Sequence, residues 1–167
     1  QGIDPHIVTG VPEHHILISL CEGLTIPNPN PNQMDGYISG TADSWTISED
    51  GKEYIFKINK DAKWSNGDSV TAEDFVWSWK RILTASLGSQ YPDMLYYLEG
   101  AYEYHNGLIN DFDLVGVKSL DMHTLKVNLK NPTPFFSGLL SHYSTWPVHK
   151  ETVLKFGDID DRNGEWT

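Results

Sequence analysis

The chain has 167 residues, with 12 lysines and arginines against 23 aspartates and glutamates, and its formal net charge is −11 at pH 7. This length predicts about one domain with a substantial hydrophobic core, and the negative charge disfavours nucleic acid and anionic lipid surfaces as partners. No apolar run approaches the roughly 20 residues of a membrane-spanning helix. A single cysteine, Cys21, excludes an internal disulfide and a multi-cysteine metal site.

The N-terminal part predicts a loop, a helix and a connector. Pro12 suits the first turn of a helix, and Gly23 is placed to help end it. Apolar residues at helical spacing between them predict a buried face in which the Cys21 thiol is inert; they are Ile16, Leu17, Leu20, Cys21 and Leu24. Alternating prolines and asparagines in residues 26–33 predict an exposed connector, either between two structural units or as a long surface loop.

Alternating apolar and polar residues predict two antiparallel hairpins. The first spans residues 41–58 around a turn at Glu49–Lys52, and the second spans residues 115–130 around a turn at residues 121–123. Each is expected to bury one face. The inward residues would be Trp45, Ile47, Tyr54, Phe56 and Ile58 in the first hairpin and Val115, Val117, Leu125, Val127 and Leu129 in the second.

The stretch from Ala62 to Leu83 predicts a strand end, a tight turn and a capped helix. Thr71 is the expected N-cap, and Asp74 can reach back as a shorter variant of the capping box. Lys80 and Arg81 suit the negative end of the helix dipole. One apolar face follows at helical spacing; its members are Phe75, Val76, Trp79, Ile82 and Leu83.

Short helices are expected within residues 94–104, 134–140 and 147–156, with a loop at residues 142–146. Together with the hairpins they predict an α+β (mixed α/β) fold. The ends of the chain, Gln1–Pro5 and residues 163–167, lack leading or closing elements, which indicates a piece of a longer protein.

The sequence gives no reason to expect an enzyme, a metal or a cofactor. Adjacent side chains in Glu13-His14-His15 diverge on a helix and match no usual zinc pattern, and Glu73 and Asp74 are explained by capping and the helix dipole. Nucleophile-elbow, P-loop and dinucleotide motifs do not occur. Six Trp, eight Tyr and six Phe fit a core by default, while a sugar-binding platform is the alternative, as in a standalone carbohydrate-binding module.

Several motifs resemble, in order and approximate spacing, the bacterial oligopeptide/dipeptide-binding proteins, the substrate-binding subunits of ABC peptide importers. The resemblance covers nearly all of this chain but about the N-terminal third of a family member. The motifs are Asp4-Pro5-His6, Gly10-Val11-Pro12-Glu13, residues 20–24, Ala42-Asp43-Ser44-Trp45, residues 62–67, residues 70–76, Ser78-Trp79-Lys80-Arg81, Gly116-Val117-Lys118, Leu120-Asp121, Thr124-Leu125 and Phe156-Gly157-Asp158.

This resemblance implies a type II periplasmic-binding-protein-like fold truncated within its N-terminal lobe. Residues 1–22 would be a strip of lobe I, residues 23–148 a small α/β subdomain, and residues 149–167 a return segment to lobe I. The implied function is capture of an extended oligopeptide between two lobes and delivery to the permease subunits of the transporter. The implied location is the periplasm or the outer face of the cell membrane, with membrane attachment only through an anchor or transporter outside this chain.

The resemblance also implies five ligand-facing residues. Thr9, Gly10 and Val11 match the strip that lines the peptide backbone, and Thr9 stands where peptide-binding members can carry a glutamate. Tyr91 and His142 match the tyrosine and histidine of the small subdomain nearest the ligand. Read from chemistry alone, Gly10 could serve a turn, Tyr91 could cap a helix and His142 could be a structural histidine.

Overall fold

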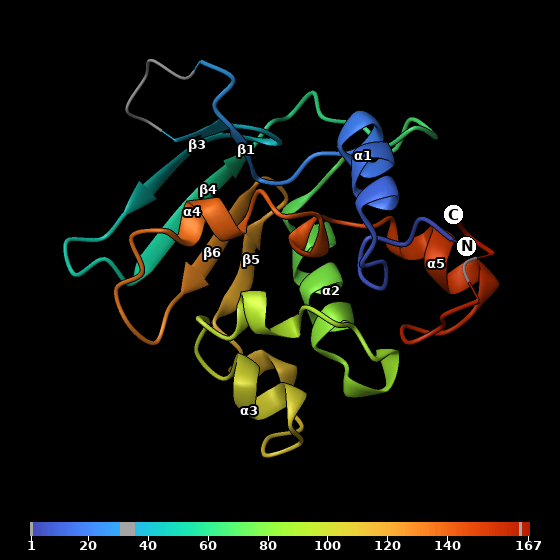
Figure 1. Cartoon of the computed structure of the whole chain (residues 1–167). Helices are drawn as coiled ribbons and strands as arrows, with labels where there is room; N and C mark the ends of the chain where they lie inside the picture. The colour runs from blue at the N-terminus through green and yellow to red at the C-terminus, as the bar shows by residue number, and fades with distance from the viewer. Residues whose placement is uncertain (1, 31–35, 164) are drawn as a thin grey trace.

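The computed structural model describes residues 2–30, 36–163 and 165–167. A four-stranded antiparallel sheet with strand order β3-β4-β6-β5 forms one layer, and α2 (Ala72–Leu83) packs against it (Figure 1). The strands are β3 (Ala42–Ile47), β4 (Glu53–Ile58), β5 (Val117–Asp121) and β6 (Thr124–Asn128). Both predicted hairpins are confirmed, and the β4–β6 pairing joins them into one sheet.

The register of β4 and β6 explains the buried face. Tyr54 lies opposite Val127 and Phe56 opposite Leu125, and all four side chains are buried because alternate residues of a strand share a face. Ile47 is the exception to the prediction: it is 51% exposed on the edge strand β3. Ile47 continues the alternation of apolar and polar residues, but it lies at the end of an edge strand, where the described core residues do not cover it.

Helix α2 confirms its predicted cap. The Asp74 backbone N–H donates to Thr71 Oγ1 at 3.4 Å, and the Thr71 backbone N–H donates to Asp74 Oδ2 at 2.7 Å. Its apolar face is buried as predicted, with Val76 only partly covered. Arg81 lies in the last turn of the helix, as the dipole argument predicted, and it is completely buried.

Helix α1 (Val11–Leu20) corrects two predictions. It ends at Leu20, before Gly23, and Leu17 is its only buried residue. The other apolar residues do not form one face but lie around the helix, so that Ile18 and Leu20 are 52% and 66% exposed. Cys21 is exposed rather than buried and is the C-cap residue that follows the helix end.

The segment predicted as a connector begins inside a strand. β1 (Thr25–Pro27) pairs antiparallel with β2 (Tyr37–Ser39) in a separate two-stranded sheet. Pro27 is tolerated at the strand end because it needs no ladder donor there. Residues 31–33 of the predicted connector lie outside the described residues.

Short elements cover the rest of the core. The helix expected within residues 94–104 is instead a 3-10 turn at Pro92–Leu95 followed by α3 (Ala101–His105). Gly100, at φ 67°, separates them in a left-handed conformation that favours glycine. The helices α4 (Phe136–Leu139) and α5 (Lys150–Phe156) fall within predicted ranges, and the expected loop at residues 142–146 holds a 3-10 turn at Tyr143–Thr145.

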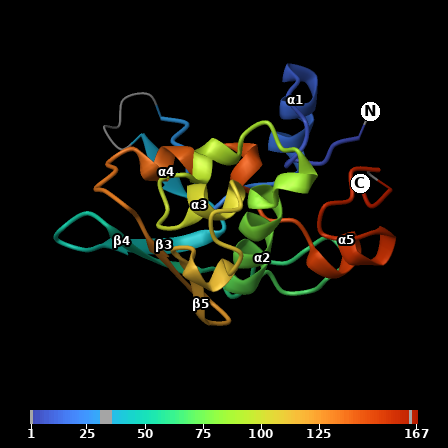
Figure 2. The same ribbon diagram turned by 90° about the horizontal axis from the view of Figure 1, so that it is seen from below.

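The two termini lie on the same side of the molecule, next to α5 and away from the sheet (Figures 1 and 2). The large core between α2 and the sheet is separate from two smaller clusters on this side. Within the described residues, none of the helices is both long and apolar enough to cross a membrane.

Candidate functional site

Tyr91 and His142, which are far apart in sequence, are in direct ring contact. Their ring centroids are 5.2 Å apart at 70°, an edge-to-face arrangement. Tyr91 precedes the turn at Pro92–Leu95 without capping it through its side chain, and His142 precedes the turn at Tyr143–Thr145. The second turn is fixed to α2 because Trp79 Nε1 donates to the Thr145 carbonyl at 2.8 Å.

The environment of His142 favours its neutral form. Burial lowers its pKa, the charge of His14 lowers it further, and Asp93 opposes the shift. Nδ1 accepts from the Ser144 backbone N–H at 3.3 Å and lies 2.7 Å from Ser144 Oγ. His142 therefore has a structural role as an N-cap, and its Nε2 remains as a donor.

Tyr143 connects this pair to the N-terminal segment, and the sequence reasoning missed it. Its hydroxyl donates to the Val8 carbonyl at 3.2 Å, and its ring lies 4.2 Å from that of His142 and 6.1 Å from that of Tyr91. Burial raises the pKa of Tyr143 to about 12, with further contributions from the Tyr91 hydroxyl and the Glu13 carboxylate. Its position directly after His142 was the only signal in the sequence.

Thr9, Gly10 and Val11 directly follow Val8, whose carbonyl accepts from the Tyr143 hydroxyl. Thr9 and Val11 are exposed, and Gly10 is the extended N-cap of α1 with φ −87° and ψ 150°. The Glu13 carboxylate occupies the space that a Cβ at Gly10 would fill. Gly10 thus allows the backbone and this carboxylate to approach closely, a role beyond that of a simple turn.

These residues provide the extended backbone of Gly10, the imidazole donor of His142 and the aromatic faces of Tyr91 and Tyr143. Such groups suit recognition of an extended peptide by main-chain hydrogen bonds and side-chain pockets. No group of three or more His, Cys, Asp or Glu within the described part of the chain is placed to hold a metal ion. The His14 and His15 rings are 5.9 Å apart at 50°.

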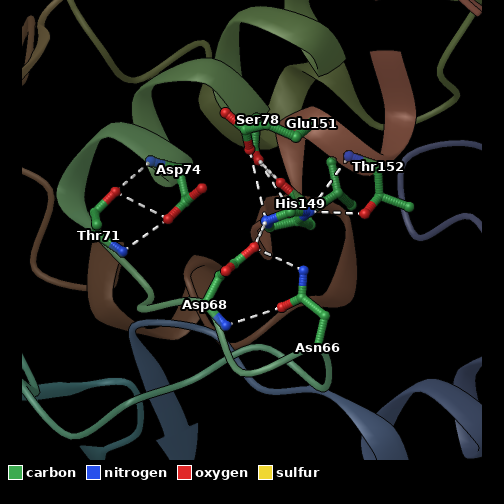
Figure 3. Close-up of polar contacts among 9 residues, drawn as sticks. Asn66, Asp68, Thr71, Asp74, Ser78, His149, Glu151 and Thr152 are labelled. Atoms are coloured by element: carbon green, nitrogen blue, oxygen red, sulfur yellow. Dashed lines mark hydrogen bonds and ion pairs between the residues drawn. The ribbon is translucent and has the colours of Figure 1, made fainter. Parts of the chain in front are cut away.

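A second polar cluster surrounds His149 at the start of α5 (Figure 3). Its Nε2 lies 3.1 Å from Asp68 Oδ2, while its Nδ1 lies 2.7 Å from Thr152 Oγ1 and accepts from the Thr152 backbone N–H at 3.3 Å. Ser78 of α2 bonds both backbone groups of Val148 next to it. Both ring nitrogens of His149 have partners within the chain, so this cluster connects the turn at Asp68, α2 and α5 to one another.

Two hollows lie away from the predicted residues. A groove of about 510 Å³ runs between the end of α1 and the turn after β4, and it includes Leu20, Cys21 and Trp64. A polar hollow of about 730 Å³ lies between the ends of β4 and β6 and includes Lys57 and Asp121. None of the five predicted ligand-facing residues lines either hollow.

Solved structures with this fold are substrate-binding proteins of the periplasmic-binding type. An oligopeptide ABC transporter substrate-binding domain from Bacillus anthracis superposes with a TM-score of 0.86 at 36% identity over 94% of this chain and 29% of its own. The Haemophilus influenzae OppA complex with RPPGFSPFR has a TM-score of 0.84 at 36% identity over 94% of this chain and 30% of its own. The described fold is therefore that of part of a solute-binding protein.

The chain belongs to the bacterial extracellular solute-binding proteins, family 5, whose middle region matches residues 36–166. It is 44% identical over 161 residues to the periplasmic oligopeptide-binding protein OppA of Escherichia coli, covering 95% of this chain and 28% of that protein. It is 39% identical over 145 residues to OppA of Bacillus subtilis, covering 87% and 24%. The chain thus spans less than a third of the length of these relatives.

Proposed function

We propose that this chain forms one side of the peptide site in the solute-binding subunit of an ABC peptide importer. The observation that carries the proposal is the contact of Tyr91, His142 and Tyr143 beside the exposed strip Thr9–Val11. Its relatives are named as oligopeptide-binding proteins, which supports an oligopeptide ligand. The subunit would capture this ligand in an extended form between two lobes and deliver it to the permease.

The chemistry of the site assigns a role to each residue. The extended backbone at Gly10, with Thr9 before it, would pair with the peptide backbone as a strand does. His142 would donate from Nε2 to a peptide carbonyl, and Tyr91 would provide an aromatic wall with a polar tip. The Glu13 carboxylate beside Gly10 would favour peptides with a positive charge at that position.

We also propose the division of the chain that the resemblance implies. Residues 1–22 would belong to lobe I, residues 23–148 to a small subdomain, and residues 149–167 to a segment returning to lobe I. The large core cluster, which lies within residues 24–140, supports the small subdomain as one unit. Leu17 and Val153 belong to two small clusters in which they pack against residues of that subdomain, Tyr143 and Trp146 in one and Trp77 and Val148 in the other.

The proposed location is the periplasm or the outer face of the cell membrane, in keeping with the periplasmic relative from Escherichia coli. The permease subunits would be the protein partner, and an anchor or transporter outside this chain would provide the contact with the membrane. The relatives are solute-binding proteins rather than enzymes, and we propose no catalysis. The carbohydrate-binding alternative gains no support, since the largest fully buried side chains include Trp79, Phe56 and Phe75.

A two-lobe mechanism predicts that this chain alone binds peptides negligibly, because the opposite wall of the site is required. Isothermal titration with di- to pentapeptides would compare the chain with a chimera in which it replaces the matching 28% of Escherichia coli OppA. The chimera is expected to bind clearly. Strong binding by the chain alone would contradict the mechanism, and tryptophan quenching by oligosaccharides without a response to peptides would favour the alternative.

Within the chimera, Tyr91→Ala and His142→Ala should each weaken peptide binding, while Tyr102→Ala, an exposed tyrosine on α3, should not. Loss of one buried contact or hydrogen bond in a binding site costs about 1–3 kcal/mol, or about 5- to 150-fold in affinity. If all three variants bind the peptide with the affinity of the unsubstituted chimera, Tyr91 and His142 are not part of the binding site.

A further inference from the structure

Arg81 is completely buried and holds together three segments that are distant in sequence. Its Nη1 donates to Asp4 Oδ1 at 3.0 Å and its Nη2 to Asp4 Oδ2 at 2.6 Å, a bidentate pair with a buried carboxylate. Nη2 also donates to the Asp161 carbonyl at 3.1 Å. The guanidinium therefore links α2 to the N-terminal segment and to the segment after α5.

One path leads from Arg81 to the strip Thr9–Val11. The Asp4 carbonyl accepts from the backbone N–H groups of Ile7 and Val8, both at 3.1 Å, which closes a turn directly before the strip. The Asp4 side chain also accepts from the His6 backbone N–H at 2.9 Å. The side chain that pairs with Arg81 thus belongs to the residue that sets the conformation of residues 4–8.

A second path leads from Arg81 to His142. Nη1 lies 2.9 Å from His6 Nδ1, and His6 Nε2 lies 3.0 Å from the Trp146 carbonyl. Since an arginine only donates, Nδ1 of His6 accepts and Nε2 carries the proton that reaches Trp146. The Trp146 backbone N–H bonds the Tyr143 carbonyl at 3.1 Å, which closes the turn that carries His142 and Tyr143.

We propose that Arg81 is a positioning residue for the ligand site, which sets the strip Thr9–Val11 and the Tyr91–His142 pair at a fixed distance from each other. This proposal rests on the proposed function, in which the strip Thr9–Val11 and the Tyr91–His142 pair form one ligand site. Arg81 does not touch the ligand. It acts through Asp4 on the strip and through His6 and Trp146 on the turn after His142.

The network requires the shape of an arginine. Two of its nitrogens make four contacts in one plane, to both Asp4 oxygens, to His6 and to Asp161. A lysine would keep the positive charge but has one nitrogen, which cannot reach these groups in the same fork geometry. Arg81→Lys therefore removes the bridging geometry while retaining the charge that the buried Asp4 needs.

The test measures peptide affinity and the His142 environment in Arg81→Lys. In the chimera, its affinity for a tight-binding peptide should fall about 3- to 30-fold, the range for substitutions that act through an intermediate residue. In this chain without ligand, the side-chain ¹⁵N resonances of His142 should shift. The matched control is Arg162→Lys, a substitution of an exposed arginine, which should change neither measurement.

His6→Gln is the second variant, because Arg81→Lys could fail to fold. It leaves the Arg81–Asp4 ion pair in place and, because a glutamine amide can still donate to the Trp146 carbonyl, it is compared with His6→Phe, which removes both ring nitrogens and so breaks the path. The His142 resonances and the affinity should change more in His6→Phe than in His6→Gln, and circular dichroism checks that each variant is folded. A folded Arg81→Lys or His6→Phe variant with unchanged affinity and unchanged His142 resonances would overturn the proposal. If the unsubstituted chimera binds no peptide, the proposed function fails, and the His142 resonances of this chain still decide whether Arg81 positions that residue.

Discussion

Helices α1 and α2 have similar lengths and similar numbers of apolar residues, yet they are held in different ways. In α2 the N-cap, the helix dipole and the apolar face all favour the same arrangement, and the helix packs against the sheet. In α1 the apolar residues lie around the helix, Gly10 provides no side-chain cap, and Leu17 alone is buried. In α2 the cap, the dipole and the apolar face agree, and the helix packs into the core through its own apolar face. In α1 these local signals do not agree, and the helix depends on contacts made by other segments.

The N-terminal segment before α1 is held by polar contacts instead. Asp4 and His6 are buried against Arg81, where burial and the Arg81 charge lower the pKa of His6 to about 4, with Asp4 and the Trp146 carbonyl opposing the shift. Helix α2 is thus stabilised by apolar burial, whose contribution does not depend on pH. The N-terminal segment is stabilised by a buried polar network, whose contribution does depend on pH.

The largest expected effect comes from the same substitution in the two helices. Ile82 on α2 is completely buried, whereas Ile18 on α1 is 52% exposed. Ile82→Ala should lower the free energy of unfolding by about 2–5 kcal/mol through lost burial and a cavity, and Ile18→Ala should change it by less than about 0.5 kcal/mol. Denaturant unfolding of this chain measures both, and comparable losses would show that α1 is packed as firmly as α2.

The next effect is a pH dependence that originates at His6. Its pKa of about 4 lies below the ordinary value of 6.5, so between these values the unfolded chain binds a proton that the folded chain does not. Stability should therefore fall as the pH decreases from 6.5 to 4, by about 3 kcal/mol from this residue.

Denaturant unfolding across this pH range measures the effect, and His6→Gln serves as the control because glutamine does not titrate. The slope of the unfolding free energy against pH should be smaller in His6→Gln than in the unsubstituted chain. Identical slopes would assign the acid sensitivity to other groups.

Capping contributes a smaller difference between the helices. Thr71→Ala removes the acceptor for the Asp74 backbone N–H at 3.4 Å and the partner of its carboxylate at 2.9 Å, and it should lower the unfolding free energy by about 1 kcal/mol. Ser65→Ala, in the exposed turn before α2, is the control and should have little effect. A loss of more than 2 kcal/mol would indicate that Thr71 has a further role.

Local chemistry predicted the parts of this fold that depend on neighbours in sequence. The capped α2 and both hairpins follow from short patterns, but the β4–β6 pairing joins residues that are 67 to 75 positions apart, from Lys57–Thr124 to Glu53–Asn128, and no local pattern in the sequence indicates it. For the same reason the sequence predicts the position of Arg81 in the last turn of α2 but not its partners Asp4 and Asp161, which lie 77 and 80 residues away. Tyr91 and His142 came from the resemblance, whereas Tyr143 required the structure.

The smallest expected effect is on the reactivity of Cys21, and it tests the packing of α1 most directly. Cys21 was predicted to be buried by the helical pattern, and the structure exposes it after the helix end. Its thiol should react completely with a thiol reagent in the folded chain, although partial burial raises its pKa and so slows the reaction relative to a free thiol.

A thiol assay without and with denaturant measures this difference, and Cys21→Ser provides the blank. Reaction that occurs only in denaturant would mean that the end of α1 is covered and that its apolar residues pack as the helical pattern predicted. Prompt reaction in the folded chain would leave the apolar surface of α1 open, and in the chimera the same thiol should become slower to react if the remaining lobes cover that surface.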